Sequence, residues 1–306
     1  ILGTHSRGIW ILDNLNALQE LNSESLVADF ELFSVPDAEQ IRYTRAFAHA
    51  GDMLFRGENP PAGALVDYYL KENVSEDDVF LEIYDTDGTL IRALDADTTA
   101  GISRVVWDLR HSRLPAAPID TVNVDTTLIR SNNSVSRGPL GPWVTPGLYI
   151  ARLTLNGRIK EAHFSVREDP RITLPVESRR AWSATALEIA ELYSLLVADN
   201  GAIQPALWYL EKYRRQGIGF DATAADEIEE TGRIYSELLS RTRSLYNQIL
   251  AWPGDLTADQ KSQWRYYQET YRRISPSGEE YQNRMLPRLN RSLPEHLRIA
   301  MPGADF

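Results

Sequence analysis

The chain has 306 residues, of which 43% are hydrophobic, an ordinary globular composition with room for about two domains. Acidic side chains outnumber basic ones 43 to 32, and the formal charge of −11 opposes binding to nucleic-acid phosphates and anionic lipid surfaces. The absence of cysteine excludes disulfides, thiolate metal sites and cysteine nucleophiles. Because of this negative charge, we do not expect a nucleic-acid partner. No apolar run is long enough to span a membrane, so we do not expect direct membrane insertion either.

The segment from Ile1 to Asp13 contains two short apolar runs separated by a polar turn, a pattern that predicts a tight β-hairpin. Two strands alone are marginally stable in water, and the chain does not begin with methionine. We therefore expect preceding sequence, or a partner, to supply the sheet that this hairpin joins. Leu15, Leu18 and Leu21 then have helical spacing and predict a short helix or turn between Asn14 and Leu32.

Apolar and polar residues alternate from about Phe55 to Glu168, as they do in β-strands. An Asp-Thr-Asp-Gly turn at 85–88 predicts one hairpin, and an Asn-Gly turn at 156–157 predicts another. Several short strands at this spacing indicate an antiparallel β-sandwich over residues 51–170. Residues 112–146 are rich in Pro, Ser and Asn, and we expect them to form a long irregular loop.

Beyond residue 170 the apolar residues recur with the period of an α-helix. The stripes and caps predict one helix that ends at Asn200-Gly201, a second that ends near Gly217 and a third from about Ala224 to Ala251. A capping-box sequence at Thr257 predicts the start of a fourth helix. A short last helix is expected from about Glu279 to Asn290.

The predicted fold class is therefore α+β with several domains. A hairpin and linker occupy residues 1–50, and the β-sandwich with its long loop occupies residues 51–170. An antiparallel helical bundle occupies residues 171–306, because consecutive helices with short links pack against each other.

Short motifs along the chain resemble the C-terminal region of bacterial sortilin-like, BNR-repeat (WD40/YVTN-like) β-propeller proteins that are named glycosyl hydrolases. The first, Gly3-Thr-His-Ser-Arg-Gly-Ile-Trp-Ile-Leu-Asp13, resembles the closing strand pair of the propeller, with Ser6 where the family usually has Gly. The other motifs are Gly57-Glu-Asn-Pro-Pro61, Asp67-Tyr-Tyr-Leu70, Leu81-Glu-Ile-Tyr-Asp85, Val105-Val-Trp-Asp-Leu109, Pro146-Gly-Leu-Tyr149, Arg167-Glu-Asp-Pro-Arg171 and Leu245-Tyr-Asn-Gln248.

This resemblance implies a propeller-closing hairpin, a sandwich similar to the immunoglobulin-like module of flagellar hook-capping proteins, and a helical tail. It also implies a periplasmic or extracellular location. We expect a non-catalytic binding or scaffolding module of a cell-envelope protein, an accessory subunit of a larger assembly. Its partner would be another protein or the missing propeller of its parent chain, with carbohydrate as a further candidate. The alternative is the accessory C-terminal portion of a glycosidase or sialidase-like enzyme whose catalytic propeller is missing from this chain.

Asp85 and Asp87 are a pair of carboxylates of the type that glycoside hydrolysis requires. Asp is also favoured in turns because its side chain accepts local backbone N–H groups, and we interpret the pair as turn residues. A calcium loop at this turn would need a glutamate where Leu94 stands. His5, next to Arg7, is interpreted as a structural residue. The pattern therefore predicts no catalytic residue.

The remaining histidines lack the i, i+4 spacing of a zinc-binding helix. They are His49, His111, His163 and His296. The sequence also lacks a phosphate-binding Gly-rich loop, a dinucleotide fingerprint and a serine-hydrolase elbow. We expect neither a cofactor nor a metal.

Several tryptophans and tyrosines have the residue type of interface anchors, and four are candidates for a partner or ligand surface. These candidates are Trp10, Tyr68, Tyr69 and Trp143. The aromatics on apolar stripes are predicted to be core residues instead, namely Trp107, Trp182, Trp264 and Tyr267. Arg214-Arg215 and Arg272-Arg273 alternate with Glu along predicted helices, which favours solvated faces with i, i+4 ion pairs.

Overall fold

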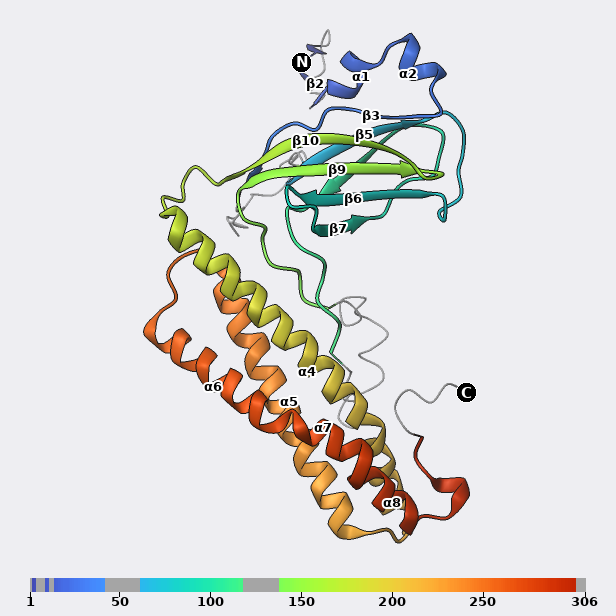
Figure 1. Ribbon diagram of the computed structural model, residues 1–306, viewed down its shortest axis with the longest axis vertical. Coiled ribbons are helices and arrows are strands. Elements are labelled where there is room, and N and C mark those ends of the chain that lie inside the picture. Colours follow the sequence, from blue (N-terminus) through green and yellow to red (C-terminus); the bar gives the residue numbers. More distant parts are fainter. Residues whose placement is uncertain (1, 4–8, 11–13, 42–60, 118–137, 301–306) are drawn as a thin grey trace, which may run out of the picture. The chain divides into compact units, whose positions relative to one another are not determined.

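The computed structural model describes residues 2–3, 9–10, 14–41, 61–117 and 138–300. The chain divides into a sheet unit, residues 1–112 and 143–173, and a helical unit, residues 113–142 and 174–306 (Figure 1). The protein is thus mixed α and β, as the predicted α+β class requires. Residues 113–142, which fall within the predicted sandwich loop, group with the helical unit.

The sheet unit contains a five-stranded sheet of order β4-β10-β9-β6-β7 and a three-stranded sheet of order β3-β5-β8. Paired strands are antiparallel, except that β4 runs parallel to β10. The strands are β3 (Phe30–Leu32), β4 (Ala38–Gln40), β5 (Ala64–Leu70), β6 (Val79–Asp85), β7 (Leu90–Leu94), β8 (Gly101–Trp107), β9 (Gly147–Leu155) and β10 (Arg158–Glu168).

Both hairpins predicted within the sheets are confirmed. Asp85 Oδ1 accepts the backbone N–H groups of Asp87 at 3.0 Å and Thr89 at 2.8 Å, so this carboxylate fixes the turn between β6 and β7. Asn156 and Gly157 have φ values of 49° and 75° between β9 and β10. Two consecutive left-handed residues match the twist of the flanking strands, which explains why Asn-Gly marks this turn.

The first part of the chain also contributes to the sheets. β1 (Leu2–Gly3) pairs antiparallel with β2 (Ile9–Trp10), in agreement with the predicted hairpin. The predicted short helix is present as α1 (Asn16–Glu20) and α2 (Ser23–Val27). Part of the predicted linker forms strands. β3 belongs to the three-stranded sheet, and β4 belongs to the five-stranded sheet.

The two sheets share one apolar core around Trp107, whose side chain is fully buried. Its ring lies 5.4 Å from that of Tyr149 and 6.0 Å from that of Phe164, both in edge-on geometry. The indole N–H donates to the Arg110 carbonyl at 2.9 Å, so the one polar atom of the ring is satisfied. The prediction that Trp107 is a core residue is confirmed.

Three long helices run side by side in the helical unit, and a shorter helical run follows them (Figure 1). The elements are α4 (Val176–Gln216), α5 (Ala222–Ala251), α6 (Ala258–Ile274), α7 (Pro276–Glu280), a π-helical turn (Tyr281–Met285), α8 (Leu286–Ser292) and a 3₁₀ turn (Glu295–Leu297). The last predicted helix, 279–290, lies within this final run. None of the helices in the described ranges is both long and apolar enough to cross a membrane.

The predicted boundary at Asn200-Gly201 is wrong, because α4 continues through it and through Pro205. Asn200 is buried and does not cap a helix end: its Oδ1 accepts hydrogen bonds from Gln204 Nε2 at 3.2 Å and Ser236 Oγ at 3.1 Å. Ser236 belongs to α5, so packing between helices overrides the local stop signal. The helix ends instead at the predicted Gly217, with φ of 67°.

The capping box predicted at Thr257 is present at the start of α6. Thr257 Oγ1 accepts the Gln260 N–H at 3.2 Å, and Gln260 Oε1 accepts the Thr257 N–H at 3.0 Å. Trp182, Trp264 and Tyr267 are 2%, 8% and 6% exposed, which confirms them as core residues of the helical unit.

Candidate functional site

The four predicted interface aromatics have different environments. Tyr68 is fully buried and its hydroxyl donates to the Asp97 carbonyl at 2.7 Å, so it belongs to the core, and the interface prediction for it is wrong. Tyr69 and Trp143 are half-buried, and the Arg110 guanidinium lies 3.9 Å from the centre of the Trp143 ring. The side chain of Trp10 lies outside the described residues, as do His5 and His49.

The other sequence candidates give no catalytic or metal constellation in the described part of the chain. Asp85 uses its carboxylate in the turn, as interpreted from the sequence. No group of three or more His, Asp or Glu side chains is placed to hold a metal ion among the residues described.

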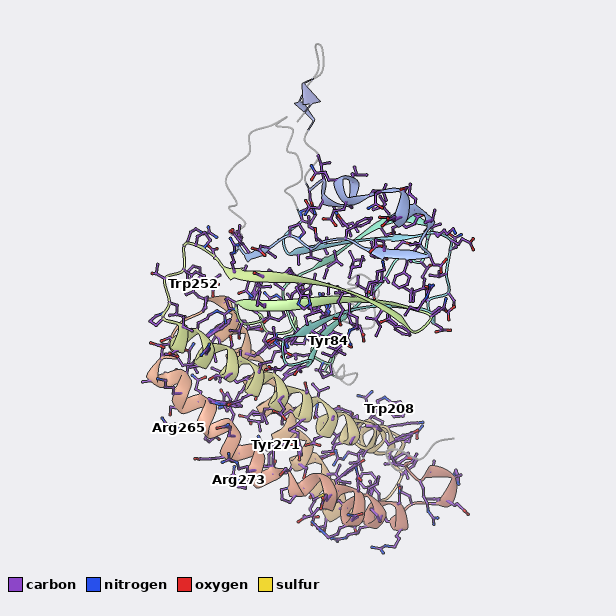
Figure 2. The ribbon with its side chains drawn as sticks, turned by 45° about the horizontal axis from the view of Figure 1, so that its top comes forward. Tyr84, Trp208, Trp252, Arg265, Tyr271 and Arg273 are labelled. Carbon is purple, nitrogen blue, oxygen red and sulfur yellow. The ribbon has the colours of Figure 1, made fainter. Side chains whose placement is uncertain are left out.

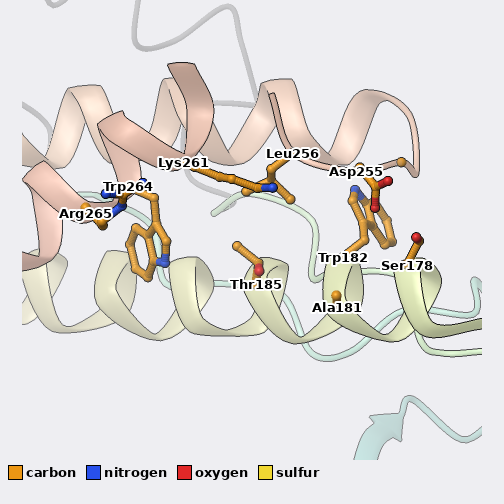
Figure 3. Close-up of a pocket in the computed structure, with 10 residues that line it drawn as sticks. Ser178, Ala181, Trp182, Thr185, Asp255, Leu256, Lys261, Trp264 and Arg265 are labelled. Atoms are coloured by element: carbon orange, nitrogen blue, oxygen red, sulfur yellow. The ribbon is translucent and has the colours of Figure 1, made fainter. Parts of the chain in front are cut away.

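A pocket of about 250 Å³ opens in the helical unit between the first turns of α4, the loop after α5 and the first turns of α6 (Figure 3). The indole of Trp264 points from α6 toward α4, and that of Trp182 points from α4 toward the loop. The polar part of the lining consists of two hydroxyl groups, two cationic side chains and one carboxylate, which belong to Ser178, Thr185, Lys261, Arg265 and Asp255.

Local sequence explains why these side chains meet. Ser178, Trp182 and Thr185 follow each other at three- and four-residue intervals, which places them on one face of α4. Lys261 and Arg265 stand four residues apart on α6 and share a face in the same way. The break after α5 and the capping box bring the two faces together.

Trp182 is held rigidly at the floor of the pocket. Its Nε1–H donates to the Ile249 carbonyl on α5 at 3.0 Å. The Arg179 guanidinium lies 4.6 Å from the centre of its ring and donates to Ser183 on the next turn. A ring fixed from two sides forms a preorganised wall, and little side-chain entropy is lost when a ligand contacts it.

The electrostatic balance of the pocket favours an anion. Neither Lys261 nor Arg265 forms an ion pair with any residue in the described ranges. Like charges at i, i+4 on a helix repel by about 0.2–0.5 kcal/mol, and a bound anion would relieve that repulsion. Ser178 lies in the first turn of α4, where exposed N–H groups add partial positive charge.

Sequence reasoning missed this pocket. Trp182 and Trp264 are core residues, as predicted, but each also lines the cavity. The available signal was two cations, Lys261 and Arg265, that stand at i, i+4 on either side of Trp264 in the sequence.

A second polar cluster lies deeper in the helical unit. The Tyr271 hydroxyl of α6 donates to Asp199 Oδ2 of α4 at 3.1 Å, and the Tyr235 hydroxyl donates to the Ile274 carbonyl at 3.0 Å. Burial raises the pKa of Asp199, although the hydrogen bond from Tyr271 partly opposes this. Burial and the adjacent carboxylate raise the pKa of Tyr271 to about 12.

We expect Asp199→Asn to make the helical unit more stable at pH 7, by less than about 1 kcal/mol. Because the pKa of Asp199 is raised on folding, its contribution is fully favourable below pH 3.8 and is lost as the pH rises through the folded value. An amide keeps the acceptor for Tyr271 without the charge, so the advantage should vanish near pH 3. Urea unfolding of the variant and of the unmodified protein, at pH 7 and near pH 3, measures the difference in their free energies of unfolding. An equal gain at both would contradict the assignment.

On the outer face of the five-stranded sheet, the charged and polar side chains pair with one another. The Arg152 guanidinium lies 4.2 Å from the centre of the Tyr84 ring and donates to Glu161 at 2.8 Å. The Tyr84 hydroxyl donates to Glu82 at 2.8 Å. This network leaves fewer groups for a ligand than the pocket does.

No protein-family model matches the chain, and no curated protein does. Among solved structures, the crystal structure of CopC from Methylosinus trichosporium OB3b is similar, with 13% sequence identity over 36% of this chain and 80% of that chain and a TM-score of 0.20. A TM-score of this size carries no argument about the fold or function of this protein.

Proposed function

We propose that this chain is a non-catalytic binding module of a larger cell-envelope protein, and that its helical unit binds a small carboxylate carried on a ring. The observation that carries this proposal is the pocket of about 250 Å³, where Lys261 and Arg265 stand without ion-pair partners in the described residues and two indole side chains line the cavity beside them.

The chemistry of the lining matches such a ligand. Guanidinium and ammonium groups form strong, charge-assisted hydrogen bonds to carboxylates, and Arg265 can donate two in parallel. The two indoles offer apolar contact to a ring, while Ser178, Thr185 and Asp255 offer partners for ring hydroxyls. The volume lies just below the range of about 300–1,000 Å³ for drug-sized ligands, which suits a single ring.

In this proposal the remaining parts have the roles that the family resemblance implies. The β1–β2 pair completes a blade of a propeller in the parent chain or a partner, and the sheet unit is an immunoglobulin-like sandwich that links it to the helical unit. The protein acts in the periplasm or outside the cell. The antiparallel pairing of β1 with β2 and the single core shared by two sheets support this arrangement.

The alternative role, as the accessory part of a glycosidase or sialidase-like enzyme, is favoured by a pocket suited to an acidic sugar. Chromogenic glycosides offered to this chain and to its full-length parent separate the two roles. Hydrolysis by the parent alone would support the accessory role. Hydrolysis by this chain alone would contradict a non-catalytic module.

Replacement of both pocket cations, in Lys261→Gln/Arg265→Gln, is expected to weaken binding of galacturonate at least tenfold. The reason is that the carboxylate loses both charge-assisted donors. Titration calorimetry measures the affinity, with galactose as the neutral ligand of matched ring. The control, Arg233→Gln/Arg241→Gln, removes the same charge from α5 and should leave the affinity unchanged.

Two results would overturn the proposal. One is equal affinity for galacturonate and galactose, since the cations would then contribute nothing. The other is failure of galacturonate and of benzoate to bind at millimolar concentration, which would leave the pocket without its ligand class.

A further inference from the structure

Four cations lie on the exposed side of α6: Lys261, Arg265, Arg272 and Arg273. We name them the α6 basic stripe. With 3.6 residues per turn, Lys261, Arg265 and Arg272 lie within about 40° of one another around the helix axis, and they span about 16 Å along it. Arg265 and Arg273 mark two points of the stripe on α6 in Figure 2. The first two members line the pocket, so the stripe continues from it.

These cations differ from several other arginines of the helical unit. Arg214, Arg215, Arg233, Arg241 and Arg284 are exposed and paired with carboxylates, as in Arg215–Glu211 at 2.8 Å, whereas Arg180, Arg243 and Arg291 have no ion pair within the described residues. The i, i+4 ion pair predicted at Arg214-Arg215 is confirmed for Arg215, whereas Arg214 pairs instead with Glu229 of α5.

The ion pairs predicted for Arg272-Arg273 are wrong. Glu269 stands four residues from both Arg265 and Arg273, yet within the described part of the chain none of the stripe cations pairs with an acid. Both arginines are exposed, as predicted, but unpaired charges of one sign on one helix repel each other. In a chain of net charge −11, such a surface is suited to an anionic ligand.

An exposed aromatic ring lies on the same side of α6 as one of these charges. Tyr266 is 53% exposed, and Arg273 follows it after seven residues, whereas Lys261, Arg265 and Arg272 lie about 100° or more away around the helix axis. A chain of uronic acids repeats one carboxylate and one apolar ring face per unit, which matches a row of cations with an aromatic ring beside its last member. An acidic peptide repeats the carboxylates without the ring faces, so it leaves Tyr266 unused.

We propose that the α6 basic stripe binds an acidic polysaccharide whose terminal uronic acid occupies the pocket. This inference rests on the proposed function, because the pocket must accept the terminal ring. The polymer then lies along α6, where each further carboxylate meets another unpaired cation. Exposed charges are screened by salt, so affinity should fall as ionic strength rises.

The test compares fluorophore-labelled hexagalacturonate with monomeric galacturonate on the full chain. The hexamer is expected to bind at least tenfold more tightly than the monomer. Arg272→Gln/Arg273→Gln should abolish that advantage and leave monomer binding unchanged. Lys261→Gln/Arg265→Gln should weaken both, and the paired-arginine control, Arg233→Gln/Arg241→Gln, neither.

The variant Tyr266→Ala tests whether binding uses the aromatic ring as well as the charges. It should weaken binding of the hexamer about fivefold or more and leave binding of poly-glutamate of equal charge unchanged, because only the sugar uses the ring. Circular dichroism melts verify that each variant remains folded. Poly-glutamate that binds as tightly as the hexamer would overturn the polysaccharide in favour of an acidic peptide.

The outcomes separate this inference from the proposed function. A hexamer that binds no more tightly than the monomer overturns the stripe as a binding surface and leaves the pocket in place. Failure of both to bind overturns the two proposals together. Hexamer binding that survives Lys261→Gln/Arg265→Gln overturns the placement of the terminal ring in the pocket.

Discussion

Replacement of Trp107 by alanine is expected to lower the free energy of unfolding of the sheet unit by about 3–5 kcal/mol. The side chain is fully buried and touches the rings of Tyr149 and Phe164, which belong to the other sheet. Its removal leaves a large cavity between the sheets and eliminates the hydrogen bond from the indole N–H to the Arg110 carbonyl. Hydrogen exchange of strand amides in rising urea, followed by mass spectrometry, reports the loss within this unit.

Phe80→Ala is the matched control for that experiment. Phe80 is also an aromatic residue of a strand in the sheet unit, but it is 51% exposed. Its truncation should cost less than about 1 kcal/mol because little buried contact is lost. Equal losses for the two variants would show that the core does not centre on Trp107.

Gly63→Ala is expected to destabilise the sheet unit by about 3 kcal/mol or more. Gly63 has φ of +136°, and a Cβ atom there would lie 2.0 Å from the Trp107 carbonyl oxygen. That oxygen belongs to the backbone of the neighbouring strand, so it cannot move aside as a flexible side chain would. The same hydrogen-exchange measurement applies.

Gly88→Ala separates backbone strain from steric contact. Gly88 also has a positive φ, +81°, but a Cβ atom there would meet nothing within 4 Å. We expect a cost of about 1–2 kcal/mol, which is the conformational penalty alone. A cost for Gly88→Ala as large as that for Gly63→Ala would mean that the close approach to Trp107 has no effect.

Features fixed by neighbouring residues were predictable from the sequence. Asp85 closes its turn with backbone groups at most four residues away, and the Asn156-Gly157 turn needs only its own φ values. The Thr257 capping box likewise acts within one turn. Such signals depend little on the rest of the fold, so the hairpins and the start of α6 agree with their predictions.

Features fixed by distant residues were not predictable. Asn200 has the residue type of a helix end, yet Ser236, on another helix, holds its side chain inside α4. The parallel pairing of β4 with β10 joins segments more than 120 residues apart. The pocket likewise needs Trp182 and Lys261 in one place, and no local pattern reports the distance between them.

The strand order determines where the sheet unit can be cut. β3 lies at one edge of the three-stranded sheet and β4 at one edge of the five-stranded sheet, and both precede residue 51. A chain shortened to begin at residue 51 would lose both, so β5 and β10 would present bare hydrogen-bonding edges. Such edges template pairing between molecules, and β5 and β10 are longer than the three-residue strands β3 and β4, so we expect a chain without Phe30–Gln40 to self-associate more readily.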